Sequence, residues 1–240
     1  VPLIIQKTDG GFNYDTTDLA ALRYRANDLK VDRAVYVTDV GQEMHFKLVF
    51  AGGEKAKFYD PTKIKLDHMG FGLVQQLDDE GNITKIKTRA GKSVKLADLL
   101  DEGRDRAIQR IEERLSKDGN KVRIDDSEKV KSAEIMGITS IKYYDLKQDR
   151  IQNYVFDFDK MLDPEGNTGV YLLYAYVRIC SILRKAAEQS KIDLAKLKKD
   201  KNESFKITHK GEKALALAIL RLPEELDLVV NELKVNRLCE

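Results

Sequence analysis

The 240-residue sequence is poor in the residues that cross-link or rigidify a chain: it has two cysteines, four prolines and no tryptophan. Cys180 and Cys239 are far apart and match no zinc or disulfide spacing, so we expect two free thiols in a reducing compartment. No apolar run approaches the roughly 18 residues that cross a bilayer, and no signal peptide is visible. We therefore expect a cytoplasmic protein with no membrane partner.

An excess of charge of one sign is also lacking. The 42 Lys+Arg and 40 Asp+Glu leave a net charge of +2, so any RNA contact must come from a local basic patch. Familiar catalytic motifs are missing too. There is no G-x-x-x-x-G-K-[ST] phosphate loop, no Ser/His/Asp or Cys/His elbow and no His pair at metal spacing, and Gly70-Phe71-Gly72 lacks the third glycine of a dinucleotide fingerprint.

The first hundred residues alternate between strand and helix patterns. A Gly-Gly turn at Asp9–Gly11 leads into a helix that opens near Tyr14, and a second helix from Gln42 should stop at Gly52-Gly53. The expected strands are 1–5 and 34–38, both buried, and 63–66, followed by a hairpin that turns at 78–82. The first strand, the helix after it and the strand at 34–38 predict a right-handed βαβ unit, and the continued alternation predicts a parallel sheet.

The rest of the chain reads as helix. The expected helices are 96–117, 127–147, 170–187, 191–199 and 211–238, the last interrupted or restarted at Pro223, with an extended segment at 154–159. A break at Asp163-Pro164 divides an α/β domain, 1–162, from an all-α domain, 163–240. Because the chain starts inside a strand pattern and ends directly after an amphipathic one, we expect a segment of a longer protein.

Polar residues follow the ends of the successive predicted strands. Because parallel strands bring their carboxyl ends to one edge, these side chains should line one crevice. A carboxylate, a phenol and an amide together suit a guanidinium, and a Lys/Thr/Arg loop suits a polyphosphate. The residues concerned are Tyr14, Asp18, Gln42, His45, His68, Lys85, Lys87, Thr88 and Arg89.

Each of these residues also has a plainer interpretation. Asp18 alone is typical of a helix cap or a first-turn dipole residue. Gln42 and His45 alone are ordinary first-turn residues, and the basic loop alone is typical of a solvated loop. Without further information, the residues predict an α/β nucleotide-type fold with a helical appendage and leave the ligand open.

Several stretches, in one order over about residues 1–185, resemble arginyl-tRNA synthetases. Those stretches are Thr8-Asp9-Gly10-Gly11 with 14–21, Gln42-Glu43-Met44-His45-Phe46, 68–72 with 87–91 and 94–96, 141–146 with Arg150 and 154–162, and 165–168 with 171–178. The resemblance implies the second half of a class I, Rossmann-like parallel-sheet catalytic domain and the first part of a helical anticodon-binding domain. It also implies ATP-dependent activation of L-arginine to arginyl-adenylate and transfer to the 3′ end of tRNA, with Mg²⁺.

The resemblance also implies roles for individual residues. Tyr14, Asp18 and Gln42 would contact L-arginine, and His45 would face ATP. The backbone at Met69, Gly70 and Phe71 would approach the adenine. The other implied roles are catalytic closure over the phosphates by Lys87, Thr88 and Arg89, and tRNA contact by Tyr171, Tyr174 and Arg178, with no metal ligand among them.

The sequence departs from the family pattern in several ways. The HIGH-type segment is absent, so we expect the chain alone to be inactive. The loop between Val74 and Lys87 is long, and Leu173 leans toward the eukaryotic cytosolic type. Two alternatives stay open: a non-catalytic synthetase-like RNA-binding or regulatory module, and a generic α/β nucleotide-binding enzyme.

Overall fold

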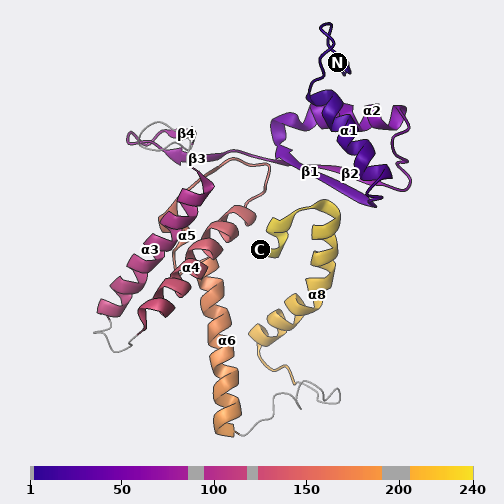
Figure 1. The fold of residues 1–240 in the computed structure, drawn as a ribbon. Coiled ribbons are helices and arrows are strands. Elements are labelled where there is room, and N and C mark those ends of the chain that lie inside the picture. The colour runs from indigo at the N-terminus through magenta and orange to yellow at the C-terminus, as the bar shows by residue number, and fades with distance from the viewer. Residues whose placement is uncertain (1–2, 86–94, 118–123, 191–205, 240) are drawn as a thin grey trace. The chain divides into compact units, whose positions relative to one another are not determined.

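The computed structural model describes residues 3–85, 95–117, 124–190 and 206–239 (Figure 1). The chain divides into two compact units. Unit 1 comprises residues 1–74 with 150–154, and unit 2 comprises residues 75–149 with 155–240. Each unit is described by itself.

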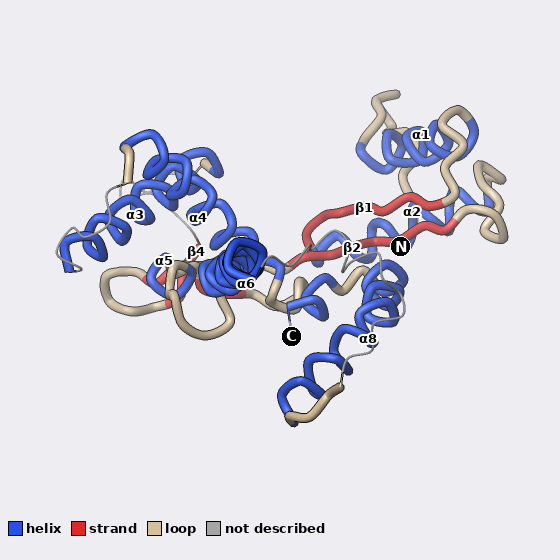
Figure 2. The backbone as a smooth tube through the Cα atoms, turned by 90° about the horizontal axis from the view of Figure 1, so that it is seen from below, coloured by secondary structure: helices blue, strands red, loops and turns tan. Residues whose placement is uncertain are grey.

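Unit 1 is built on one parallel strand pair. Its elements are α1 (Tyr14–Asn27), β1 (Arg33–Asp39), the 3₁₀ turn η1 (Val40–Gln42), α2 (Glu43–Lys55) and β2 (Lys65–Phe71). The strands lie side by side (Figure 2), in a register that runs from Arg33 opposite Lys65 to Asp39 opposite Phe71. Because α2 connects two parallel strands, β1–α2–β2 is a βαβ unit. The unit predicted from a strand at 1–5 through the first helix to the strand at 34–38 is wrong for the described residues, because residues 3–5 form no strand.

The core of unit 1 lies on one face of the strand pair. Along β1, Ala34 and Tyr36 are buried whereas Val35 and Val37 are exposed. The two helices lie on the same side of the strands in Figure 1, and their buried side chains join those of the strand. The clusters are Leu19 with Leu22 and Val49, and Ala34 with Tyr36 and Phe46. The strand predicted at 34–38 is therefore present but buried on one face only.

The prediction of a buried strand at residues 1–5 is wrong for the residues that the structure describes. Residues 3–5 form no strand, and Ile4 and Ile5 are exposed. The Ile4 N–H donates to Asp15 Oδ2 at 3.2 Å, and the Thr16 hydroxyl donates to the Ile5 carbonyl. The backbone groups of this segment therefore meet side chains of α1 rather than a neighbouring strand.

The prediction that Gly52-Gly53 stops the second helix is also wrong, because α2 continues to Lys55. A Cβ on Gly52 would lie 2.8 Å from Leu3 Cδ1, and one on Gly53 would lie 3.1 Å from Leu22 Cδ1. The glycines therefore let neighbouring side chains approach α2 closely, and this packing overrides their poor helix propensity.

Unit 2 is mostly helical. Its elements are β3 (Val74–Leu77), β4 (Ile83–Lys85), α3 (Leu96–Lys117), α4 (Asp126–Leu146), β5 (Tyr154–Val155), α5 (Phe158–Met161), α6 (Gly169–Ser190), α8 (Lys210–Glu232) and the 3₁₀ turn η2 (Val235–Cys239). The three short strands pair in the order β4-β3-β5. The predicted hairpin is present: β3 and β4 are antiparallel, and Gly81 in their turn has φ +83°.

Helices α3 and α4 lie side by side in Figure 1 and approach closely at two glycines. A Cβ on Gly137 would lie 2.6 Å from the carbonyl carbon of Gly103. Ala107 and Ala133, together with Leu162, form the buried cluster beside this crossing. Gly137, which weakens the sequence prediction of this helix, therefore lies where the backbones of the two helices meet.

Two other predictions for unit 2 need correction. Residues 154–159 are not extended throughout, because α5 begins at Phe158, where the Asp157 side chain caps the Asp159 and Lys160 N–H groups. The last helix, α8, runs through Pro223 and ends at Glu232 rather than at 238, with Leu233 at φ 58°. Because proline has no N–H, α8 passes Pro223 with one backbone hydrogen bond fewer than a regular helix.

One helix of the sequence prediction is not tested. The helix expected at 191–199 lies outside the described residues. Across the described part of the chain, none of the helices combines the length and apolar character that a bilayer span requires.

His68 lies in β2 against the core of unit 1. Its Nε2 is 2.8 Å from the Thr38 hydroxyl, and its ring stacks on Phe46 at 5.2 Å between centroids. Burial lowers the pKa of His68; Arg150 and Lys47 act in the same direction, and Glu43 opposes them. The folded protein therefore favours the neutral imidazole.

We predict that His68→Gln reduces the acid sensitivity of the fold. A histidine whose pKa is depressed on folding binds fewer protons than in the unfolded chain, so stability falls as the pH drops below its ordinary pKa of about 6.5. Thermal unfolding between about pH 7 and pH 5 should show a shallower loss in His68→Gln. Thr38→Val keeps the imidazole and should keep the wild-type slope. Equal slopes in all three proteins would contradict this.

We predict that Gly137→Ala destabilises the protein, although alanine is the better helix former by about 1 kcal/mol. The added methyl group would meet the α3 backbone, and overpacking of this kind costs about 1–3 kcal/mol. Urea unfolding followed by circular dichroism measures the change. Ser132→Ala, at an exposed position of the same helix, is the control and should be neutral or slightly stabilising. Wild-type stability in Gly137→Ala would refute the close crossing.

Candidate functional site

The N-terminus of α1 presents three side chains from its first two turns. Asn13 precedes the helix in an extended conformation, so the helix begins at Tyr14. The Asp15 carboxylate accepts from the Ile4 N–H at 3.2 Å and from Asn13 Nδ2 at 3.3 Å, both through Oδ2. Tyr14 and Asp18 are four residues apart and Asp15 and Asp18 three apart, spacings that place each pair on one helix face.

His45, in the first turn of α2, meets this face of α1. Its Nε2 lies 2.7 Å from Asp18 Oδ2, and its Nδ1 lies 3.3 Å from Asp15 Oδ1. The edge of the Tyr14 ring approaches the imidazole, with 4.9 Å between centroids. We call Tyr14, Asp15, Asp18 and His45 the His45 cluster.

The contacts in the His45 cluster exclude one interpretation of Asp18. Asp18 is the fifth residue of α1, beyond the positions where a side chain caps the helix, and its carboxylate bonds to His45. The helix-cap interpretation is therefore wrong. The resemblance assigns Asp18 to arginine and His45 to ATP. The structure brings the two side chains into direct contact, whereas their substrate roles stay predictions.

The carboxyl ends of β1 and β2 form the second part of the site. Asp39 ends β1, and its side chain accepts from the Gly41 N–H at 2.7 Å, which tightens the turn that leads to Gln42. A Cβ on Gly70 would lie 3.1 Å from Val40 Cα, so β2 passes closely under this turn. The segments holding Gln42 and Met69–Phe71 therefore meet at one sheet edge, as the parallel-strand rule predicts.

The remaining candidate residues lie elsewhere. Tyr171, Tyr174 and Arg178 are exposed on α6 in unit 2, at spacings that put them on one helix face. Lys87, Thr88 and Arg89, predicted to close over the phosphates, lie outside the described residues. The long segment between Val74 and Lys87 is described as far as Lys85 and forms the hairpin of β3 and β4. Among the predicted site residues, the structure thus brings together only those of unit 1, the ones predicted for arginine and ATP.

Sequence reasoning missed Asp15 and Asn13 as members of the site. Asn13 Oδ1 is buried without a hydrogen-bond partner, while its Nδ2 donates to Asp15. The three-residue spacing of Asp15 and Asp18 was the available signal. It could not identify His45 as the shared partner, because that contact comes from another helix.

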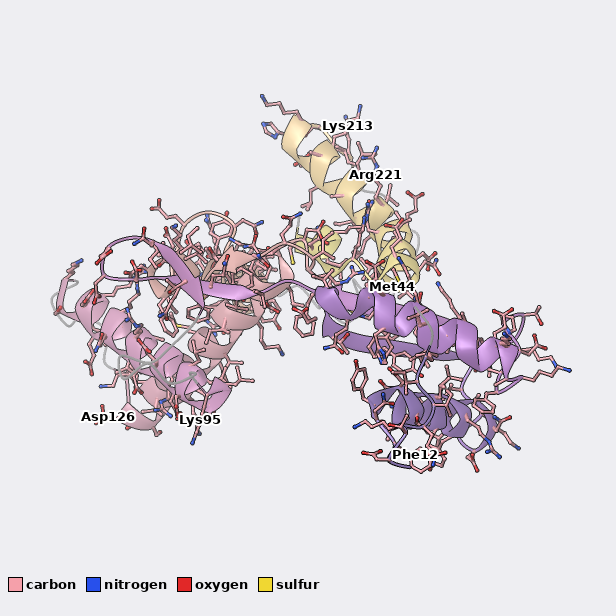
Figure 3. The ribbon with its side chains drawn as sticks, turned by 90° about the horizontal axis from the view of Figure 1, so that it is seen from above. Phe12, Met44, Lys95, Asp126, Lys213 and Arg221 are labelled. Atoms are coloured by element: carbon pink, nitrogen blue, oxygen red, sulfur yellow. The ribbon has the colours of Figure 1, made fainter. Side chains whose placement is uncertain are left out.

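The His45 cluster offers acceptors to a cationic ligand. The side chain of Asp18 is 34% exposed, and Tyr14 is 67% exposed. Phe12 and Met44, which are labelled in Figure 3, are both exposed and lie close in sequence to Tyr14 and His45. An exposed carboxylate beside a phenol can accept several N–H donors, as a guanidinium requires.

A divalent metal does not fit the His45 cluster. The two carboxylates face different nitrogens of His45, so the three groups do not converge on one position. Within the ranges that the structure describes, no group of three or more His, Cys, Asp or Glu residues could hold a metal ion. None of the described residues is therefore assigned to Mg²⁺.

Two family models match the chain. The model described as tRNA synthetases class I (R), catalytic domain, matches residues 1–158. The model described as DALR anticodon binding domain matches residues 172–240. The residues of the His45 cluster all lie within the first match.

Curated relatives match this chain from its first to its last residue. An arginine–tRNA ligase of Picosynechococcus sp. is 46% identical over 240 residues, which is 100% of this chain and 39% of that protein. The chloroplastic/mitochondrial arginine–tRNA ligase of Arabidopsis thaliana is 42% identical over 244 residues, 100% of this chain and 36% of that protein. The chain thus spans well under half the length of these relatives.

Solved structures agree. The arginyl-tRNA synthetase of Plasmodium falciparum has a TM-score of 0.79 at 35% identity, covering 100% of this chain and 37% of that one. The Thermus thermophilus arginyl-tRNA synthetase has a TM-score of 0.70 at 19% identity, covering 98% and 40%, and supports the fold alone. The catalytic-domain model matches more than half of the 240 residues of this chain, and the chain therefore belongs to the class I (R) family of tRNA synthetases.

Proposed function

We propose that the full-length protein is an arginine–tRNA ligase. It would use ATP to convert L-arginine to arginyl-adenylate and then transfer the arginyl group to the 3′ end of tRNA. The observation that carries this proposal is the end-to-end match of the chain, at 46% identity, to a relative named arginine–tRNA ligase. The His45 cluster supports it with a carboxylate suited to a guanidinium.

Arginine recognition would rest on unit 1. The Asp18 carboxylate would pair with the guanidinium, and the Tyr14 hydroxyl and Gln42 amide oxygen would accept further N–H groups. A guanidinium carries five N–H donors in a planar fork, whereas a lysine ammonium has three on a point charge. Acceptors arranged around a fork therefore select arginine over lysine.

The proposed reaction needs little general acid–base catalysis from protein side chains. The arginine carboxylate would attack the α-phosphorus of ATP, and pyrophosphate would leave. Holding both substrates in line supplies most of the acceleration in such a step. The backbone at Met69–Phe71 is proposed for the ATP side because the strand ends meet there and Gly70 leaves room for close approach. His45, which the resemblance also puts on the ATP side, contacts Asp15 and Asp18 instead, so we assign ATP to the strand ends alone.

Other assignments rest on the resemblance. Lys87, Thr88 and Arg89 are proposed to close over the phosphates, where the charges of Lys87 and Arg89 would neutralise phosphate charge. Tyr171, Tyr174 and Arg178 are proposed to contact tRNA, because exposed aromatic rings stack on bases and arginine pairs with phosphate. The domain boundary at 162/163 and a cytoplasmic location are part of the same proposal.

We predict that the full-length protein catalyses arginine-dependent ATP–pyrophosphate exchange and that Asp18→Asn lowers kcat/KM for arginine about 10- to 100-fold, the range expected for a lost charge-assisted hydrogen bond. Asp28→Asn, at an exposed position just after α1, is the matched control and should behave as wild type.

Two outcomes would contradict this prediction in different ways. No exchange by the wild-type full-length protein would favour the non-catalytic RNA-binding or regulatory module. Exchange that is unchanged in Asp18→Asn would keep the ligase and remove Asp18 from the arginine site.

We further predict that the 240-residue chain alone gives no exchange above background. It spans 39% of the length of its relatives, and catalysis by positioning needs both substrates to be held. Isotope exchange with arginine, ATP and tRNA present measures this, with the full-length protein as the positive control. Arginine-dependent exchange by the chain alone would overturn the prediction.

A further inference from the structure

His45 lies between two carboxylates that differ in exposure. The side chains of Asp15 and His45 are 13% and 15% exposed, whereas that of Asp18 is 34% exposed. The three groups therefore run from a largely buried acid, through the imidazole, to an acid that solvent or a ligand can reach. A carboxylate thus faces each ring nitrogen: Asp18 Oδ2 is hydrogen-bonded to Nε2 at 2.7 Å, and Asp15 Oδ1 lies 3.3 Å from Nδ1.

Asp15 is the fixed end of this row. Its Oδ2 accepts from the Ile4 N–H and from Asn13 Nδ2, at 3.2 and 3.3 Å. Its Oδ1 is then directed at His45 Nδ1. A carboxylate held by a backbone and a side-chain donor gives the imidazole a fixed partner, and a partner on one ring nitrogen sets what the other presents.

We propose that Asp15 and His45 are positioning residues for arginine recognition. Asp15 orients the His45 ring, and His45 Nε2–H holds Oδ2 of Asp18, which leaves Oδ1 to meet the guanidinium. The inference rests on the proposed function, in which Asp18 contacts the substrate. Neither Asp15 nor His45 needs to touch arginine for this role.

The positioning role differs from that of a purely structural contact between α1 and α2, which we call a strut. A strut supports the whole sheet edge, so its loss should lower stability and raise the KM values for arginine and ATP together. The proposed contacts from Asp15 through His45 to Asp18, which we call the relay, act on Asp18 alone. Loss of Asp15 or His45 should therefore raise KM for arginine while KM for ATP and kcat stay close to wild type. The preorganised carboxylate lowers the ordering cost of binding.

Exchange kinetics of the full-length protein test the relay. We expect Asp15→Asn and His45→Ala each to raise KM for arginine about tenfold, the scale of one lost hydrogen bond to a charged group. His45→Gln keeps one N–H donor and should fall between His45→Ala and wild type. Asp28→Asn should change neither KM. Unchanged arginine KM values in Asp15→Asn and His45→Ala, or an equal rise in both KM values, would overturn the proposal.

A double-mutant cycle separates the relay from a simple charge effect. If Asp15 acts through His45, Asp15→Asn should add nothing to the arginine KM of His45→Ala, because residues of one network are not additive. If Asp15 only attracts the cationic substrate through its charge, the two effects should multiply, which would overturn the proposal.

Asp18→Asn distinguishes failure of the relay from failure of the proposed function. Wild-type arginine activation in Asp18→Asn would remove the premise. A defect in Asp18→Asn together with wild-type KM values in Asp15→Asn and His45→Ala would leave the arginine site in place and refute the relay alone.

Discussion

The hydrogen bond between His45 Nε2 and Asp18 Oδ2, at 2.7 Å, joins the polar ends of the two helices of unit 1. The same helices share an apolar core through Leu22 and Val49. A small shift of α1 would therefore disturb both the packing and the carboxylate that the proposed substrate needs. Stability and recognition depend on the same helix pair, so a core substitution there should also alter substrate affinity.

The sequence predicted elements best where local pattern and packing agree. The spacing of apolar residues placed α1, α3, α4 and α6 to within a few residues, and the turn chemistry placed the hairpin. It failed at residues 3–5, at Gly52-Gly53 and at Pro223. In the first two cases the outcome depends on side chains from elsewhere in unit 1, which no local window contains. At Pro223 the general rule that proline interrupts a helix did not hold, because α8 continues to Glu232.

The candidate site was also predicted in part from the sequence. The strand-end rule and the resemblance named Tyr14, Asp18, Gln42 and His45, and the structure places them in unit 1. Neither source indicated that one imidazole faces both Asp15 and Asp18. That arrangement depends on the crossing of two helices, and crossing geometry follows from packing rather than from residue order. The relatives identify the family, but the contacts of His45 had to be seen in three dimensions.

The parallel register of β1 and β2 has a consequence for how this chain tolerates changes of length. Neighbouring residues of a strand face opposite sides, so gaining or losing one residue within 65–71 would turn His68 away from Phe46 and carry Gly70 out from beneath Val40. The connection at 56–64, between α2 and β2, has no such constraint from pairing. Length variation among homologues should therefore collect in that connection and be excluded from the strand that follows it.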